Sequence, residues 1–193
     1  VVAAGGVRLP WGGTTRGAAG GCWLRRAAAP RTQRVLSGMA AGIMRAASVW
    51  SLLLPAIERT RELGVAAWVP PSAGLVLGAA GLLRLESMAG QLLQRGKSRR
   101  VLAVTLHNLP EGMVVGLAAA LALSGEPDAV SGALALSLGI GLQNIPEGAA
   151  VSLPLAPRGR TRPPALGAGA ASGLAAPPGA LAGCAIAGGV PAA

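Results

Sequence analysis

Two short polar signatures carry the side chains of this chain that could bind a metal ion. The first is His107–Gly112 (HNLPEG), and the second is Gln143–Gly148 (QNIPEG), which begins 36 residues later. Side chains three or four residues apart share one face of a helix. Each signature therefore presents its first two residues and its Glu as a polar stripe. Both lie inside long apolar runs, where a carboxylate is costly and indicates a functional site.

The two stripes together form a plausible ligand set for a divalent cation. They supply one imidazole, two carboxylates and several amide oxygens, but no thiolate. Such mixed nitrogen and oxygen donors suit zinc, iron, manganese or cobalt rather than copper(I). Among the seven acidic residues, only Glu111 and Glu147 lie in the interior of a predicted span. The predicted metal ligands are His107, Asn108, Glu111, Gln143, Asn144 and Glu147.

A proline precedes the Glu in each signature. Pro110 and Pro146 lack an amide donor and clash with the carbonyl four residues earlier, so they free the carbonyls of Leu106 and Leu142. Irregular backbone at membrane depth is tolerated where it lines a cavity. A purely structural alternative stays open, in which His107 is a core histidine and the polar side chains only join helices.

Composition indicates a membrane protein. Of 193 residues, 52% are hydrophobic and 12% are charged, and the mean hydropathy is +0.54. Soluble domains average about 25% charged residues, so this chain has too little charge to cover a soluble surface. The net charge of +10 would also suit a nucleic-acid binder. The basic residues lie between apolar runs instead, so we expect no nucleic-acid partner.

The apolar runs predict an all-α, multi-pass transmembrane bundle of five or six helices. About 20 apolar residues are needed for each span, and only helices satisfy the backbone in lipid. Residues 1–34 form a basic N-terminal segment, residues 35–155 the core, and residues 156–193 a Pro/Gly/Ala-rich segment. The expected spans are Thr14–Leu24 (weak), Val35–Ile57, Trp68–Leu83, Val101–Leu123, Ala129–Leu155 and Ala165–Val190, the last broken by Pro177 and Pro178.

The connecting segments alternate in charge. Segments 25–34, 95–100 and 158–162 carry eleven Lys and Arg residues, whereas the segments on the other side carry only Arg59 and Arg61. The positive-inside rule then places the three basic segments in the cytoplasm. This alternation supports a multi-pass protein of the cell membrane.

Several further residues have weaker signals. Arg45 lies inside a predicted span and could face a cavity, while Arg84 and Glu86 lie at a span end, where they can snorkel to the interface. Small residues four apart let membrane helices approach closely. The pairs with that spacing are Gly38 and Gly42, Gly74 and Gly78, and Gly112 and Gly116.

Residues 35–155 resemble the ZIP family of divalent-metal transporters, in particular its GufA-like branch. Three stretches carry the resemblance: Leu36–Glu58 (LSGMAAGIMRAASVWSLLLPAIE), Val104–Gly112 (VTLHNLPEG) and Gly139–Leu155 (GIGLQNIPEGAAVSLPL). The resemblance implies an eight-helix transporter with a two-metal site and alternating access. It implies that His107, Gln143 and both Glu residues hold the primary metal. The second metal would use Asn108 and Asn144, with the Glu residues bridging.

The chain also departs from that family. Ala176 stands where similar proteins have a glutamate, the segment before residue 101 has no histidine, and no seventh or eighth helix follows. We therefore expect a member truncated or altered at both ends.

The sequence favours a transporter and not an enzyme. The expected activity is movement of a divalent metal, foremost zinc but also iron, manganese, cobalt or cadmium, toward the cytoplasm. The metal is the cargo, no cofactor is expected, and the lipid bilayer is the expected surroundings. A homodimer stays open, as do two alternatives: a non-transporting membrane fragment or assembly partner, and an intramembrane metal-dependent hydrolase. The hydrolase is disfavoured because the chain has a single His and no H-E-x-x-H motif.

Overall fold

The protein is an all-α helix bundle, as predicted. A computed structural model describes residues 2–23, 30–62, 64, 66–92, 96–123, 129–155 and 163–188, and none of these residues forms a strand. The α-helices are α1 (Val2–Trp23), α2 (Pro30–Ala46), α3 (Leu54–Glu62), α4 (Val69–Leu92), α5 (Gly96–Leu123), α6 (Ala129–Leu155), α7 (Pro163–Ser172) and α8 (Ala176–Gly188). A π-helix, η1 (Ala47–Leu53), joins α2 to α3, and a 3₁₀-helix, η2 (Gly173–Ala175), joins α7 to α8.

Five continuous helical segments among the described residues, which we call rods, are long and apolar enough to cross a membrane. They comprise Arg34–Arg61, Val69–Gln91, Val101–Leu123, Ala129–Leu153 and Pro163–Gly188. This confirms the multi-pass architecture. Helix α1 adds a sixth rod of 22 residues, which begins well before the weak span expected at Thr14–Leu24.

The last rod corrects one sequence prediction. Pro177 and Pro178 were expected to break the sixth span, yet the helical path continues from α7 through η2 into α8. The tighter turn of η2 ends just before Ala176, so both prolines fall in the first turn of α8. A first turn tolerates proline because its amide groups have no intrahelical acceptor.

The bundle buries small and polar residues and exposes large apolar ones. Its largest fully buried side chains are Val115, Val151, Asn108, Asn144 and Thr14, whereas many leucines are exposed. A soluble core has the reverse order, because its apolar side chains must leave water. In lipid, helices instead associate through small residues and interhelical hydrogen bonds. The pattern therefore agrees with surroundings of lipid.

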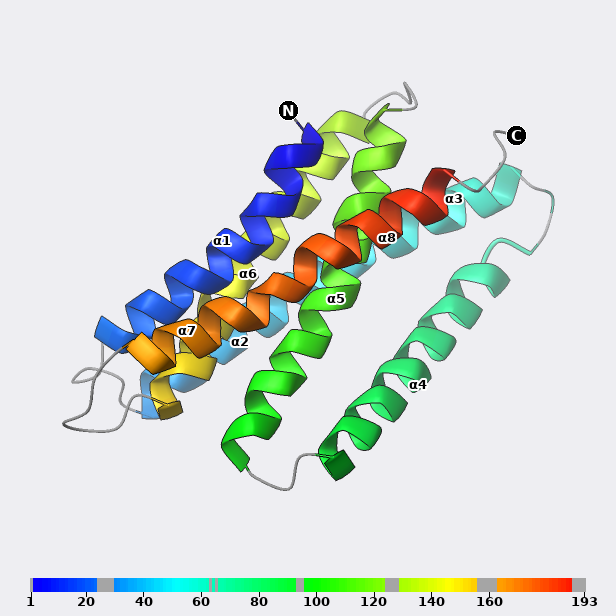
Figure 1. The fold of residues 1–193 in the computed structure, drawn as a ribbon. Coiled ribbons are helices and arrows are strands. Elements are labelled where there is room, and N and C mark those ends of the chain that lie inside the picture. The colour runs from blue at the N-terminus through cyan, green and yellow to red at the C-terminus, as the bar shows by residue number, and fades with distance from the viewer. Residues whose placement is uncertain are drawn as a thin grey trace.

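Four rods pack tightly and form what we call the inner bundle: α1, α5, α6 and α7–η2–α8. Helix α1 packs along α6, and α8 packs along α5 (Figure 1). A methyl group added to Gly17 or Gly148 would overlap the backbone between α1 and α6, and one on Gly112 would do so between α5 and α8. Backbone thus meets backbone at both interfaces.

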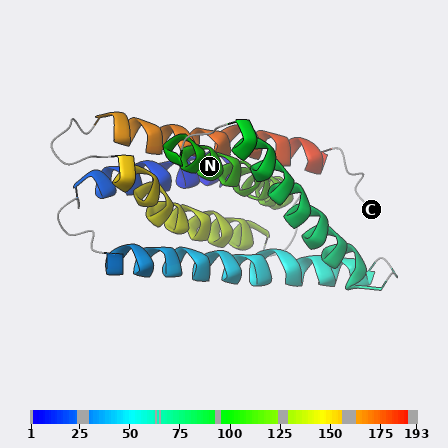
Figure 2. The ribbon, with the colours of Figure 1, turned by 90° about the horizontal axis from the view of Figure 1, so that it is seen from below.

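The remaining rods form what we call the outer pair: α2–η1–α3 and α4. Figure 2 shows α2–η1–α3 along one side of the molecule and α7–η2–α8 along the opposite side. None of the apolar window of α4 is buried, and only 6% of that of α2–η1–α3 is. The predicted glycine pairs split accordingly. Gly112 and Gly116 contact α8, whereas no atom of another element lies within 4 Å of a methyl placed on Gly38, Gly42, Gly74 or Gly78.

The helix ends alternate as the charge pattern requires. The ends that flank segments 25–34, 95–100 and 158–162 lie at the lower end of the molecule in Figure 1, and α3 with Glu58, Arg59 and Arg61 lies at the other end. Residues 30–34 and 96–100 begin α2 and α5. Residues 24–29, 95 and 156–162, with the basic side chains that they carry, lie outside the described part of the chain.

Candidate metal site between α5 and α6

The two signatures face each other across α5 and α6. Gln143 Nε2 donates to Glu111 Oε1 at 2.6 Å, and Asn144 Nδ2 donates to Asn108 Oδ1 at 3.1 Å. Both helices continue through their prolines, so the polar residues stay in helical register. Asn108, Gln143 and Asn144 are buried, and Glu147 is partly buried. The predicted juxtaposition of the two polar stripes is present.

The hydrogen bonds of the three amide side chains show which end of each amide carries the NH₂ group. The Gln143 amide donates to a carboxylate, the Asn144 amide also donates to the Pro10 carbonyl at 3.2 Å, and the Asn108 amide donates to the Val104 carbonyl at 2.9 Å. Since carboxylate and carbonyl oxygens only accept, the NH₂ orientation of each amide is determined.

Five buried polar atoms have no hydrogen-bond partner among the described residues, and all five belong to predicted ligands. They are His107 Nδ1, Glu111 Oε2, Gln143 Oε1, Asn144 Oδ1 and Glu147 Oε2. A buried acceptor without a donor costs about 1–3 kcal/mol, so each one needs an explanation. Four oxygens and one imidazole nitrogen are suitable donors for a divalent cation.

Glu111 of α5 and Glu147 of α6 each leave the oxygen Oε2 without a partner among the described residues. A divalent cation bound by both carboxylates would balance two negative charges. Within the described ranges, no three His, Cys, Asp or Glu side chains gather closely enough to hold a metal ion. A metal here would therefore need the amide oxygens of Gln143 and Asn144 beside the carboxylates.

His107 has an additional neighbour that the sequence did not predict. Its Nδ1 lies 3.4 Å from Glu86 Oε1 of α4, and both side chains are a little over one-third exposed. The expected span ended at Leu83, but the rod continues to Gln91, so Glu86 lies inside it and approaches His107. That Glu86 snorkels to the interface stays a prediction. The approach depends on how α4 leans on α5, which spacing along one helix does not reveal.

A cavity of about 290 Å³ opens beside these residues. His107, Glu111 and Gln143 supply polar groups to its wall. The outer pair supplies Ser48 and four apolar side chains: Met44, Ala47, Leu52 and Leu82. The cavity therefore lies where the inner bundle meets the outer pair. Arg45, which could have faced a cavity, is exposed and is not among the lining residues.

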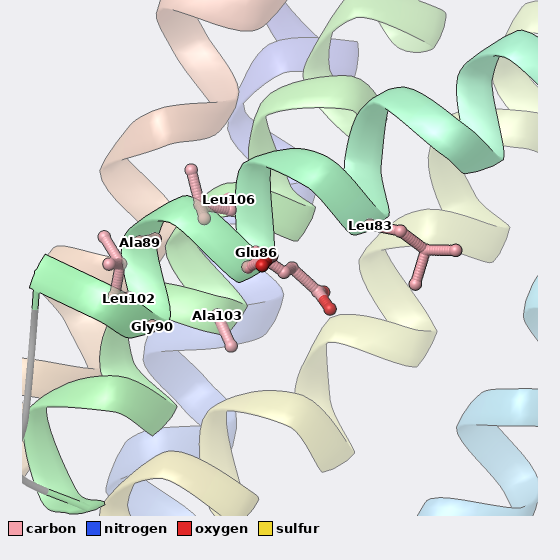
Figure 3. Close-up of a pocket in the computed structure, with 8 residues that line it drawn as sticks. Leu83, Glu86, Ala89, Gly90, Leu102, Ala103 and Leu106 are labelled. Atoms are coloured by element: carbon pink, nitrogen blue, oxygen red, sulfur yellow. The ribbon is translucent and has the colours of Figure 1, made fainter.

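A second cavity, of about 300 Å³, lies between α4 and α5. Glu86 and Gly90 come from α4, and Leu102, Ala103 and Leu106 come from α5 (Figure 3). Glu86 lines this cavity and His107 lines the first one. Leu106 lines the second cavity and His107, the next residue of α5, lines the first. The two cavities are therefore neighbours at the contact between His107 and Glu86.

Two further elements of the site were not predicted. The Pro10 carbonyl of α1 contacts Asn144, although residues 1–34 were expected only to be a basic N-terminal segment with a weak span. The Gly13–Gly21 stretch repeats glycine every four residues, and this spacing could have indicated a close helix contact.

Ala176, where the resemblance expects a glutamate, is buried against Gly112, next to Glu111 in the chain.

Comparison with known proteins gives no assignment. No protein-family model matches this chain, and no curated protein matches it.

Proposed function

We propose that the protein carries a divalent metal ion, foremost zinc, across the cell membrane toward the cytoplasm. The observation that supports this most is the set of five buried atoms, four oxygens and one imidazole nitrogen, that have no hydrogen-bond partner among the described residues. All five come from the six predicted ligands. The resemblance of residues 35–155 to ZIP transporters, which rests partly on the same two signatures, implies the same cargo.

Charge favours a divalent cargo over a monovalent one. Two carboxylates of the same sign lie within one buried site, and a single divalent ion neutralises both. Nitrogen and oxygen ligands without sulfur suit zinc, iron, manganese, cobalt or cadmium better than copper(I). A transported ion must also leave its site, and neutral amide ligands keep binding moderate.

The two cavities suggest a route for the ion. The first opens beside Glu111 and Gln143, and the second lies nearer the helix ends that precede and follow residues 93–95. Passage between them would bring the ion past His107 and Glu86. The basic segments favour a cytoplasmic location for that end of the bundle. Alternating access would then expose the site to each side in turn.

The test is zinc uptake into proteoliposomes that contain the full chain. We expect zinc uptake by the parent and its loss in Glu147→Ala, because one charge-balancing carboxylate is gone. Glu58→Ala is the matched control, since Glu58 is exposed in α3. Equal uptake by the parent and Glu147→Ala would reject the role of Glu147. No uptake by the parent would favour a non-transporting fragment.

A further inference from the structure

The Pro10 carbonyl of α1 is shared by two side chains next to the candidate site. It accepts hydrogen bonds from Asn144 Nδ2 at 3.2 Å and from Thr14 Oγ1 at 3.1 Å. Pro10, Thr14 and Asn144 are all fully buried. Helix α1 thus places a main-chain acceptor against a predicted metal ligand, although it contributes no ligand itself.

Glycines bring this carbonyl within reach. A methyl group on Gly13 would overlap the Gly141 carbonyl and lie 3.2 Å from Asn144 Cβ. A methyl on Gly141 would lie 3.3 Å from the Leu9 carbonyl oxygen, one residue before Pro10. Larger residues at either position would push α1 away from Asn144.

We propose that α1 is a positioning element of the metal site, in which the Pro10 carbonyl orients the Asn144 amide so that its Oδ1 faces the cation. This inference rests on the proposed function. The carbonyl can only accept, so it selects the NH₂ end of the amide. Asn108 Oδ1 selects the same end from the opposite side. Asn144 Oδ1 is left unpaired and available to a metal.

The reason for such support is energetic. A side-chain amide whose NH₂ group turned toward a cation would repel it, and a freely rotating amide must be ordered when the metal binds. Groups that orient metal ligands typically change metal affinity by about 10- to 100-fold when they are removed. We expect the lower end of that range, because Asn108 continues to hold the amide.

The experiment measures zinc affinity by competition with a chelating dye, on full-length protein purified in detergent. Gly13→Ala should weaken zinc binding by about tenfold. Gly20→Ala is the matched control on the same helix, because no atom of another described element lies within 4 Å of a methyl added there. In an Asn144→Ala background, Gly13→Ala should have no additional effect, since the ligand it acts through is gone.

A milder variant keeps the test decisive if Gly13→Ala fails to fold. Gly141→Ala displaces α1 by only a few tenths of an ångström, and it should weaken binding severalfold in the parent but not in Asn144→Ala. Equal weakening in both backgrounds, or unchanged affinity in both glycine variants, would overturn the positioning role. If Asn144→Ala has no effect while Glu147→Gln abolishes binding, the positioning role is wrong and the proposed function survives. If neither variant alters binding, the proposed function itself fails.

Discussion

The inner bundle and the outer pair are built from similar apolar helices but pack in opposite ways. In the inner bundle, backbone touches backbone at Gly13, Gly17, Gly148 and Gly112. In the outer pair, none of the apolar window of α4 is buried, and no atom of another described element lies within 4 Å of a methyl placed on Gly74 or Gly78. Glycine spacing alone therefore does not create an interface. A second helix must arrive with a small surface of its own.

The difference also separates two roles in the candidate site. All six predicted ligands lie on α5 and α6 of the inner bundle, and three of them, Asn108, Gln143 and Asn144, are buried there. The outer pair contributes cavity wall and the carboxylate of Glu86. We interpret the inner bundle as the part that holds the ion and the boundary with the outer pair as the path along which it moves.

The largest expected effect compares one glycine from each region. Gly148→Val would force two methyl groups against the Thr14 carbonyl, which belongs to a helix backbone and cannot yield. We expect a loss of about 3 kcal/mol in the free energy of unfolding, the upper part of the range for overpacking. Gly78→Val should leave stability unchanged or slightly raised, because valine forms helix better than glycine. Unfolding of both variants by SDS in mixed micelles measures this difference.

Equal destabilisation by the two valine substitutions would contradict the division into a tight and a loose region. It would mean that α4 packs against an element that the described residues do not place there.

A second prediction sharpens the boundary between the regions. Leu82 lines the first cavity from α4, and Leu82→Trp would place an indole into the path of the ion. A transport barrier raised by about 1.4 kcal/mol would slow zinc uptake about tenfold, which is the effect we expect. Thermal stability should change little, because Leu82 is outside the inner bundle.

Leu77→Trp is the control for this experiment, since Leu77 is 72% exposed on the same helix and lines neither cavity. Uptake that stays at the parental rate in Leu82→Trp would remove the outer pair from the transport path.

The smallest expected effect concerns pH. Metal ligands must be deprotonated, so metal binding to the two carboxylates competes with protons and weakens as the proton concentration rises. Zinc affinity should fall severalfold between pH 7.5 and pH 5.5, and by at most about tenfold per pH unit for each proton displaced. Zinc titrations at both pH values measure this. Affinity that rises at the lower pH would exclude carboxylate ligands from the inner bundle.

Much of this fold could be predicted from the sequence, because lipid reduces the choice of structure to helices. The spans at Val101–Leu123 and Ala129–Leu153 begin where the apolar runs begin. The juxtaposition of the two polar stripes also followed from sequence, since such stripes in lipid have few surfaces to face except each other. The specific hydrogen bond from Gln143 to Glu111 comes from the structure.

The remaining features depend on contacts between distant elements. Helix α1 is rich in glycine and contains Arg16, so its own composition indicates only a weak span, and its packing along α6 supplies the missing preference. Glu86 is 21 positions from His107, and only the tilt of α4 brings the two together. Pro10 contributes a backbone atom, which no side-chain motif could reveal.

The central claim is that Glu111 and Glu147 of the inner bundle hold a divalent ion together with the amide oxygens beside them. X-ray absorption of zinc bound to the full-length protein tests it most directly, for the parent and for the double variant Glu111→Gln/Glu147→Gln. In the parent, we predict that all zinc ligands are nitrogen or oxygen atoms. In the double variant, we predict no stoichiometrically bound zinc. A zinc shell that contains sulfur, or zinc binding that persists unchanged in the double variant, would contradict the account.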